Sequence, residues 1–223
     1  TLLMSATLAG IRLRALGIGA ETFAALQALT TALVQTLTRP PSEGARADAD
    51  AACDRRTLWP LGISGDRPIV LVSAGALQGR ALLRSLAQAL RLWAWGGIAC
   101  DLVVINAEPV SYQMDLQHEL SALRGRHAAE GGAELTGWHL LRAADLPPGA
   151  LGTLRRLARV RLHADGRPLL HQLRECSALH DQDSVHRQET STTALAAVAE
   201  GVAGAPQGRL VRDVALGPQG QRR

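Results

Sequence analysis

The sequence predicts an α/β fold, with a small parallel sheet of about four strands, helices on both faces, a helical segment before it and a disordered tail after it. Short apolar runs with β-branched residues alternate with longer amphipathic stretches between residues 58 and 175. Strands that alternate with helices at this spacing form parallel sheets through right-handed crossovers. Aromatic residues make up only 3% of the 223 residues, so we expect a core of Leu, Val, Ile and Ala.

Composition divides the chain into four zones. Leu and Ala dominate the first zone, polar residues the second, and alternating apolar and amphipathic stretches the third. The fourth zone has few large apolar side chains, which is typical of disorder. The zones are a helical segment (1–41), a linker (42–57), an α/β domain (58–179) and a disordered tail (180–223).

Apolar periodicity and helix-stop signals set the expected elements. In the helical segment, a first helix ends near Gly17 and a second begins after Gly19, where Glu21 suits the positive end of the helix dipole. Pro68 suits the first residue of a strand, because a missing N–H is tolerated there. The expected strands are residues 69–72, 102–105, 138–141 and 160–163. The expected helices between them are residues 76–95, 111–123 and 147–157.

The charged and sulfur-containing residues exclude several classes of function. All 24 basic residues are arginine, and the net charge is only +4. Without a basic stripe interleaved with aromatics, we expect no nucleic-acid binding. Cys53, Cys100 and Cys176 are odd in number and far apart, so we expect reduced thiols rather than a disulfide framework or a zinc site. The histidine spacings fit no metal site either.

The apolar runs are too short for a transmembrane helix, which needs roughly 18 consecutive apolar residues. The richest run is interrupted by Arg84, Gln88 and Arg91. Residues 1–10 are apolar but lack the basic leader of a signal peptide. We therefore expect a soluble segment with no direct membrane insertion.

The second expected strand ends in polar residues, at the edge of the sheet where α/β folds bind ligands. Asn106 and Glu108 offer hydrogen-bond acceptors there, and Tyr112 adds a hydroxyl about one helical turn later. These three side chains are the candidates for binding a sugar hydroxyl or a partner loop. The alternative is that Pro109 and Ser111 only start the next helix.

A polar loop precedes the first strand, at the opposite edge of the sheet. Gly62 and Gly65 suit unusual backbone angles, and Asp66 suits closing a turn with its side chain. We expect a structural role for this loop. The alternative is that Ser64 and Asp66 contact a neighbouring domain.

The loop after the first strand, residues 73–80, opens a helix whose N–H groups could bind an anion. Only Gly75 and Gly79 are present, and no Gly-Lys-Ser/Thr follows. The loop therefore lacks both a dinucleotide fingerprint and a Walker motif, and a plain strand-to-helix turn is expected. A carboxylate pair suited to glycoside chemistry is not evident. We therefore expect no catalytic residue, no cofactor and no metal in this chain.

Two blocks carry a resemblance to a known family. The first is Trp59 followed by residues 62–66 and 68–72, and the second is residues 101–103 with Asn106, Glu108 and Tyr112. Together they resemble bacterial cyclic β-1,2-glucan synthases, in a segment near the part that is similar to glycoside phosphorylases. The chain departs from the family pattern at residues 60–61, at Arg67 and at Ala107.

The resemblance implies a role within a large inner-membrane enzyme. Members of that family resemble a fusion of a UDP-glucose-using glucosyltransferase with β-sandwich and helical-barrel modules. This chain would then be an accessory segment, on the cytoplasmic side of the membrane, that packs modules of its own parent together or contacts β-glucan. The alternative function is a free-standing Rossmann-like domain that binds a nucleotide or a phosphorylated ligand.

Overall fold

The computed structural model describes residues 2–38, 54–109, 114–129 and 134–178, and their arrangement confirms the α/β fold. Four strands form one parallel sheet in the order β3-β2-β1-β4. Each expected strand is present and extends further than its apolar run. The strands are β1 (Ile69–Ala74), β2 (Cys100–Asn106), β3 (Thr136–Arg142) and β4 (Ala158–His163). The expected tail, 180–223, and most of the expected linker, 42–57, lie outside the described residues.

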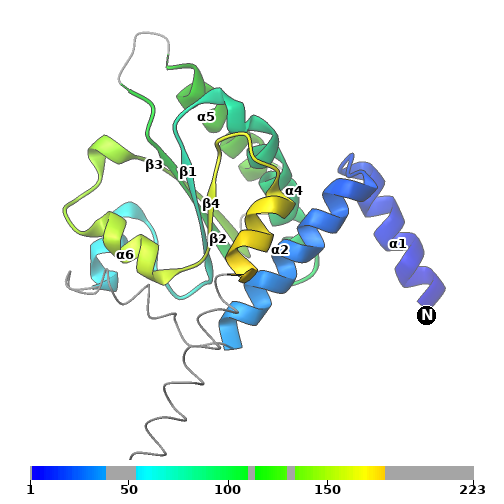
Figure 1. The fold of residues 1–223 in the computed structure, drawn as a ribbon. Helices are drawn as coiled ribbons and strands as arrows, with labels where there is room; N and C mark the ends of the chain where they lie inside the picture. The colour runs from blue at the N-terminus through cyan, green and yellow to red at the C-terminus, as the bar shows by residue number, and fades with distance from the viewer. Residues whose placement is uncertain (1, 39–53, 110–113, 130–133, 179–223) are drawn as a thin grey trace, which may run out of the picture. The chain divides into compact units, whose positions relative to one another are not determined.

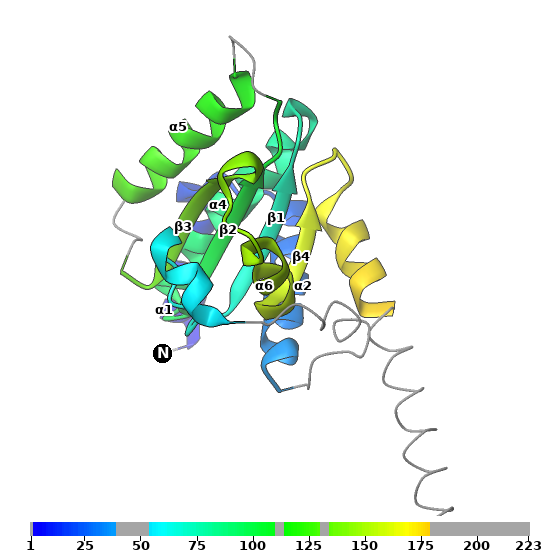
Figure 2. The same ribbon diagram turned by 90° about the vertical axis from the view of Figure 1, so that its left-hand side faces the viewer.

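Helices cover both faces of this sheet, as Figures 1 and 2 show. One face packs against α2 (Ala20–Thr38), α4 (Arg80–Trp95) and α5 (Asp115–Ala129), and the other against α6 (Ala150–Leu157) and the 3-10 helix η2 (Arg55–Leu61). The β1-to-β2 and β2-to-β3 connections therefore use one face, and the β3-to-β4 connection uses the other. The sheet grows from β1 through β2 to β3 on one side, and β4 is then added on the other side of β1. The order of strand addition thus reverses between β1 and β4.

The two inner strands are buried on both faces, as expected for a parallel sheet between helices. In β1, Val70 and Val72 pack with the α2, α4 and α5 side, and Leu71 packs with the α6 side. In β2, Val104 packs with the α2, α4 and α5 side, and Val103 packs with the α6 side. This alternation follows from the two-residue period of strand side chains.

Helix α2 belongs to the same hydrophobic core as the sheet. Leu26, Leu29 and Leu33 recur at helical spacing and are at most 2% exposed. Trp93 of α4 also donates its indole Nε1–H to the Thr30 hydroxyl across a 2.8 Å distance. The sequence placed this helix in a segment before the α/β domain, whereas the structure packs it on the sheet.

Three helices begin later than the sequence predicted, each for a local reason. A short 3-10 helix, η3 (Leu77–Gly79), precedes α4. Met114 has a φ of 42°, which is incompatible with a helix, so α5 begins one residue later at Asp115. Gly149 has a φ of 78°, and α6 begins directly after it.

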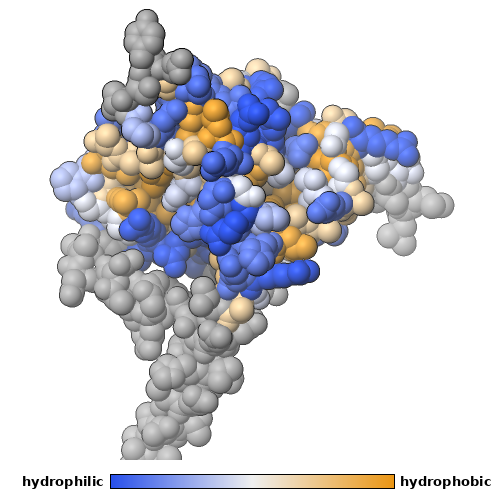
Figure 3. Space-filling view, turned by 45° about the horizontal axis from the view of Figure 1, so that its top comes forward, coloured by the Kyte–Doolittle hydropathy of each residue, from blue (hydrophilic) through white to orange (hydrophobic). Residues whose placement is uncertain are grey.

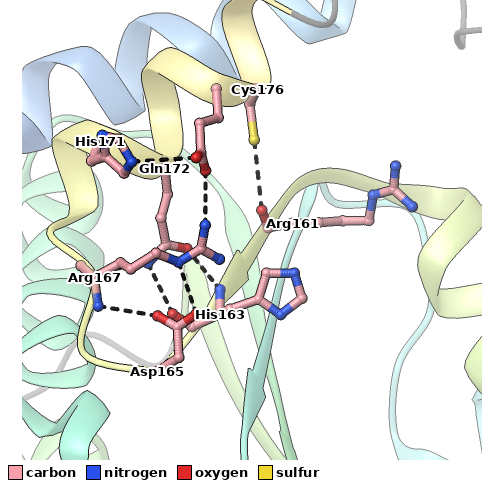
Figure 4. Close-up of polar contacts among 8 residues, drawn as sticks. Arg161, His163, Asp165, Arg167, His171, Gln172 and Cys176 are labelled. Carbon is pink, nitrogen blue, oxygen red and sulfur yellow. Dashed lines mark hydrogen bonds and ion pairs between the residues drawn. The ribbon is translucent and has the colours of Figure 1, made fainter.

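A further helix, residues 169–178, follows β4 and was not predicted. Leu169 and Leu173 bury one of its faces in the core. Gln172 is 3% exposed, and its amide accepts from the His163 N–H at 2.8 Å and donates to the His163 carbonyl at 2.9 Å. Figure 4 shows this side chain between the helix and the outer edge of β4. The Gln172 side chain therefore occupies two backbone groups at the outer edge of β4. An additional strand that paired with this edge would otherwise bond to them.

Helix α1 (Leu2–Ala15) carries several exposed apolar side chains. Met4, Leu8 and Ile11 are 81%, 48% and 58% exposed. Figure 3 shows hydrophobic residues among hydrophilic ones on this helix, at the right of the view. Within the described part of the chain, no single helix has the length and hydropathy to cross a membrane. The pair Thr7–Ala15 and Ala20–Val34 meets these criteria only jointly and bends by 107°.

Candidate functional site

The polar residues predicted at the carboxyl end of β2 lie in an internal hydrogen-bond network. Asn106 is the last residue of β2 and is 2% exposed. Its amide Nδ2 donates to Gln117 Oε1 at 2.7 Å, and its Oδ1 accepts from the Glu108 N–H at 2.9 Å. Both ends of the Asn106 amide are therefore bonded to this chain, and they fix the start of the β2-to-α5 connection.

Glu108 binds the first turn of α5. One carboxylate oxygen accepts from the Leu116 N–H at 3.1 Å, and the other from the Gln117 N–H at 3.0 Å. The first N–H groups of a helix have no partner within the helix, and a carboxylate at this end also matches the helix dipole. Glu108 thus acts as a helix cap from outside the helix, several residues before Asp115. Tyr112, the third predicted member of this site, lies outside the described residues.

Replacing Glu108 with alanine is expected to lower the free energy of unfolding by about 0.5–2 kcal/mol, which is the usual effect of losing a helix cap. Glu108→Gln keeps an acceptor oxygen and should lower it less. Urea unfolding followed by circular dichroism measures both variants. Equal stability of Glu108→Ala and the parent would contradict the capping role.

The crevice between β1 and β4, where the chain reverses direction, is the usual ligand position in open α/β sheets. In this protein η3 fills that position. A Cβ placed on Gly79 would overlap with the Cβ and the carbonyl of Ala164, the residue after β4. Gly79 is therefore needed because two backbone segments approach each other closely. The expected plain turn after β1 thus packs on the end of β4.

The loop before β1 contains the two glycines that the sequence predicted for unusual backbone angles. Gly62 has a φ of 74° and Gly65 a φ of 75°. The Asp66 side chain was expected to close this turn, but the Ser64 hydroxyl accepts the Asp66 N–H instead, at 3.2 Å. The Asp66 carboxylate faces the Arg55 guanidinium at 3.8 Å, and both side chains are largely exposed. This loop holds η2 next to the first strand.

Replacing Gly65 with valine is expected to destabilise the domain by about 1–3 kcal/mol, because a β-branched residue resists a positive φ. The space around Gly65 is not limiting, since the nearest atoms to a Cβ added at this position would lie 3.7 Å away. Differential scanning calorimetry measures the change in melting temperature. Gly65→Asn is the matched control, because asparagine adopts a positive φ more readily than valine does. An unchanged transition for Gly65→Val would refute the conformational argument.

A buried aspartate with two basic neighbours, at the amino end of β2, was not predicted from the sequence. Asp101 is 4% exposed, and its Oδ1 lies 3.7 Å from Arg67 Nη1 and 3.9 Å from His139 Nε2. A Cβ on Gly137 would lie 2.5 Å from that same oxygen. The sequence signal was a glycine in β3 at the position paired with an aspartate in β2. Gly137 thus makes room for a carboxylate that would otherwise be crowded.

Cys100 directly precedes Asp101 and is buried. Burial, and then the negative charge of Asp101, raises the pKa of the Cys100 thiol to about 12. Because the thiolate is the nucleophile and the metal ligand, this cysteine is chemically inert near neutral pH. Among the residues that the structure describes, no group of three or more His, Cys, Asp or Glu side chains is arranged to hold a metal ion.

Comparison with known proteins finds a similar segment in a much longer bacterial protein. No protein family model matches the sequence. The chain is similar to the cyclic beta-(1,2)-glucan synthase NdvB of Rhizobium meliloti (strain 1021), with 28% identity over 196 residues. The match covers 85% of this chain but only 7% of the length of that protein. The resemblance noted in the two sequence blocks is thus supported by a similarity that extends over most of the chain.

Proposed function

We propose that this chain is an accessory, non-catalytic α/β segment of a carbohydrate-active glucosyltransferase similar to cyclic β-1,2-glucan synthase. The observation that carries this proposal is the match itself, since 85% of the chain aligns with 7% of a much longer synthase. A segment of this size serves a larger enzyme by packing its modules together. Contact with the glucan product is a second role that the same placement allows.

The geometry of the sheet supports a structural role for the segment. At the carboxyl edge, the Asn106 amide and the Glu108 carboxylate bond to Gln117 and to the first turn of α5. At the reversal point between β1 and β4, Gly79 packs directly on Ala164. Both places where an α/β sheet usually binds a substrate or nucleotide are occupied by the chain's own groups. The same observation disfavours a free-standing nucleotide-binding domain.

The proposal extends to the surroundings of the segment. Its partners are the remaining domains of its own parent chain, with β-glucan as a surface ligand. It needs no cofactor, and it works on the cytoplasmic side of an inner membrane to which the parent is anchored. The catalytic acids of the transferase and phosphorylase-like parts belong to those other domains.

Sequencing the reading frame on both sides of this chain tests the proposal. We expect β-sandwich and helical-barrel sequence in the same frame, together with a glucosyltransferase region. A parent with the segment deleted in frame should then lose cyclic glucan synthesis, although its catalytic residues are intact. A reading frame that contains only this chain would refute the assignment to a larger synthase.

A further inference from the structure

Exposed apolar residues form one narrow seam along helix α1. Met4, Leu8, Ile11 and Ala15 are all exposed, and they follow one another at spacings of four, three and four residues. At 3.6 residues per turn, this spacing places them on one side of the helix. Alternating spacings of three and four residues are typical of the seam along which two helices pack in a coiled coil. The α1 seam therefore has the geometry that receives a second helix.

The carboxyl-terminal end of α1 is attached to α4, so the seam has a defined orientation. The Gln88 amide of α4 donates to the Leu16 carbonyl at 2.9 Å, and Leu16 is buried. The Arg12 guanidinium also lies over the Trp95 ring, 5.4 Å from its centroid. Figure 1 shows α1 extending from this end away from the sheet. The helix thus presents its apolar seam to a neighbouring surface in a fixed direction.

The charges beside the seam favour an acidic partner. Arg12 directly follows Ile11 and Arg14 directly precedes Ala15, so the two arginines flank the seam on opposite sides. Within the part of the chain that the structure describes, no carboxylate pairs with either arginine. Charges at such flanking positions form salt bridges between helices and select the partner. The complement of α1 is therefore an apolar helix that carries Asp or Glu beside its own seam.

Two other occupants fit α1 less well. Residues 2–15 contain no Asp or Glu, so a second copy of the helix would bring further arginines and no carboxylate to compensate them. A lipid surface suits a helix with one broad apolar face opposite a strongly polar face. In α1, Leu13 lies on the side away from the seam and the arginines flank the seam, so this division is missing.

We propose that the seam of α1 packs against an acidic helix of the parent chain that lies outside residues 1–223. This assignment rests on the accessory role proposed above, and it names the surface through which the segment meets a neighbouring module. The similar synthase is long enough to supply the partner, since the matched region is only 7% of its length. Packing would bury Met4, Leu8 and Ile11 and pair the flanking arginines with carboxylates.

Photo-cross-linking in the full-length parent tests the partner. Leu8 is replaced by the photoreactive residue p-benzoylphenylalanine, the parent is irradiated, and mass spectrometry identifies the joined peptide. We expect a peptide of the parent from outside residues 1–223, with apolar residues at helical spacing and Asp or Glu beside them. A joined peptide from residues 1–223 of a second copy, a lipid adduct, or no cross-link would each overturn the proposal.

Two variants of α1 test the seam itself. Ile11→Glu adds a carboxylate on the seam, and Ala9→Glu adds one at an exposed position off the seam. In the parent with the photoreactive residue, Ile11→Glu should lower the cross-linking yield roughly tenfold or more, as expected for the loss of a central apolar contact, and Ala9→Glu should leave it nearly unchanged. Equal yields from the two variants would overturn the proposal.

The melting temperature of the isolated chain controls for unfolding. Ile11 and Ala9 are both exposed, so neither variant should change the stability of the chain by more than about 0.5 kcal/mol. Sequencing the reading frame separates the two proposals. A frame without further modules refutes the accessory role, and the docking of α1 with it. A parent that contains those modules, but in which Leu8 gives no cross-link, refutes the docking of α1 alone.

Discussion

Gly79→Ala is expected to lower the free energy of unfolding by about 1–3 kcal/mol, the usual cost of overpacking a tightly packed site. The added methyl group would overlap with the backbone and side chain of Ala164. Backbone atoms cannot move aside as the end of a flexible side chain can, so η3 would have to shift away from the end of β4. The melting temperature should fall by roughly 2–12 °C, at about 2–4 °C per kcal/mol for a chain of this size.

Gly75→Ala is the matched control for this experiment. Gly75 lies earlier in the same connection, and a Cβ placed on it meets nothing within 4 Å. Alanine should therefore be tolerated there, or should stabilise slightly by restricting the unfolded chain. Identical melting curves for the Gly79→Ala and Gly75→Ala variants would mean that Gly79 and Ala164 do not pack closely. The crevice between β1 and β4 would then have room for a side chain.

Gln172→Leu is expected to destabilise the domain by about 2–3 kcal/mol. The backbone groups that form hydrogen bonds with the Gln172 amide would lose their partners. Those groups are the His163 N–H, the His163 carbonyl and the Arg167 carbonyl. Leucine has a similar size, so the loss comes from hydrogen bonding rather than from a cavity. Chemical denaturation with matched m-values measures the change.

The expected effect of Gln172→Leu extends to association. Exposing the outer edge of β4 offers a template for pairing with another strand, and so the variant should aggregate more readily. Arg174→Leu adds an equally apolar side chain at an exposed position of the same helix and controls for that change. Light scattering that rises equally in both variants would show that surface hydrophobicity, not the edge, is responsible.

The two inner strands, β1 and β2, were the most predictable, because they are buried on both faces of a parallel sheet. Runs such as residues 69–72 and 102–105 are apolar on both faces and bounded by turn residues, and this pattern has few other interpretations. The helix starts were less predictable, because they depend on local backbone turns and caps that the apolar pattern does not show. The late start of α5 depends on Glu108, which caps a helix that begins well after it in the chain.

The candidate site was predictable in position but not in role. Asn106 and Glu108 do lie at the carboxyl end of β2, as strand order requires. The sequence could not reveal that Gln117 and the α5 N-terminus bond them, because these partners meet only in the folded chain. The helix of residues 169–178 was missed although Leu169, Gln172 and Leu173 have helical spacing, because the hydrogen bonds of Gln172 to His163 form only once β4 is in place.

The central claim is that this chain is an accessory segment without catalytic activity of its own, and a turnover assay of the purified chain tests it most directly. The chain is incubated with UDP-glucose, and separately with β-1,2-glucan and inorganic phosphate. We expect no glucan, no released UDP and no glucose 1-phosphate in either reaction. Product formation that persists through repurification and scales with the concentration of the chain would contradict the claim.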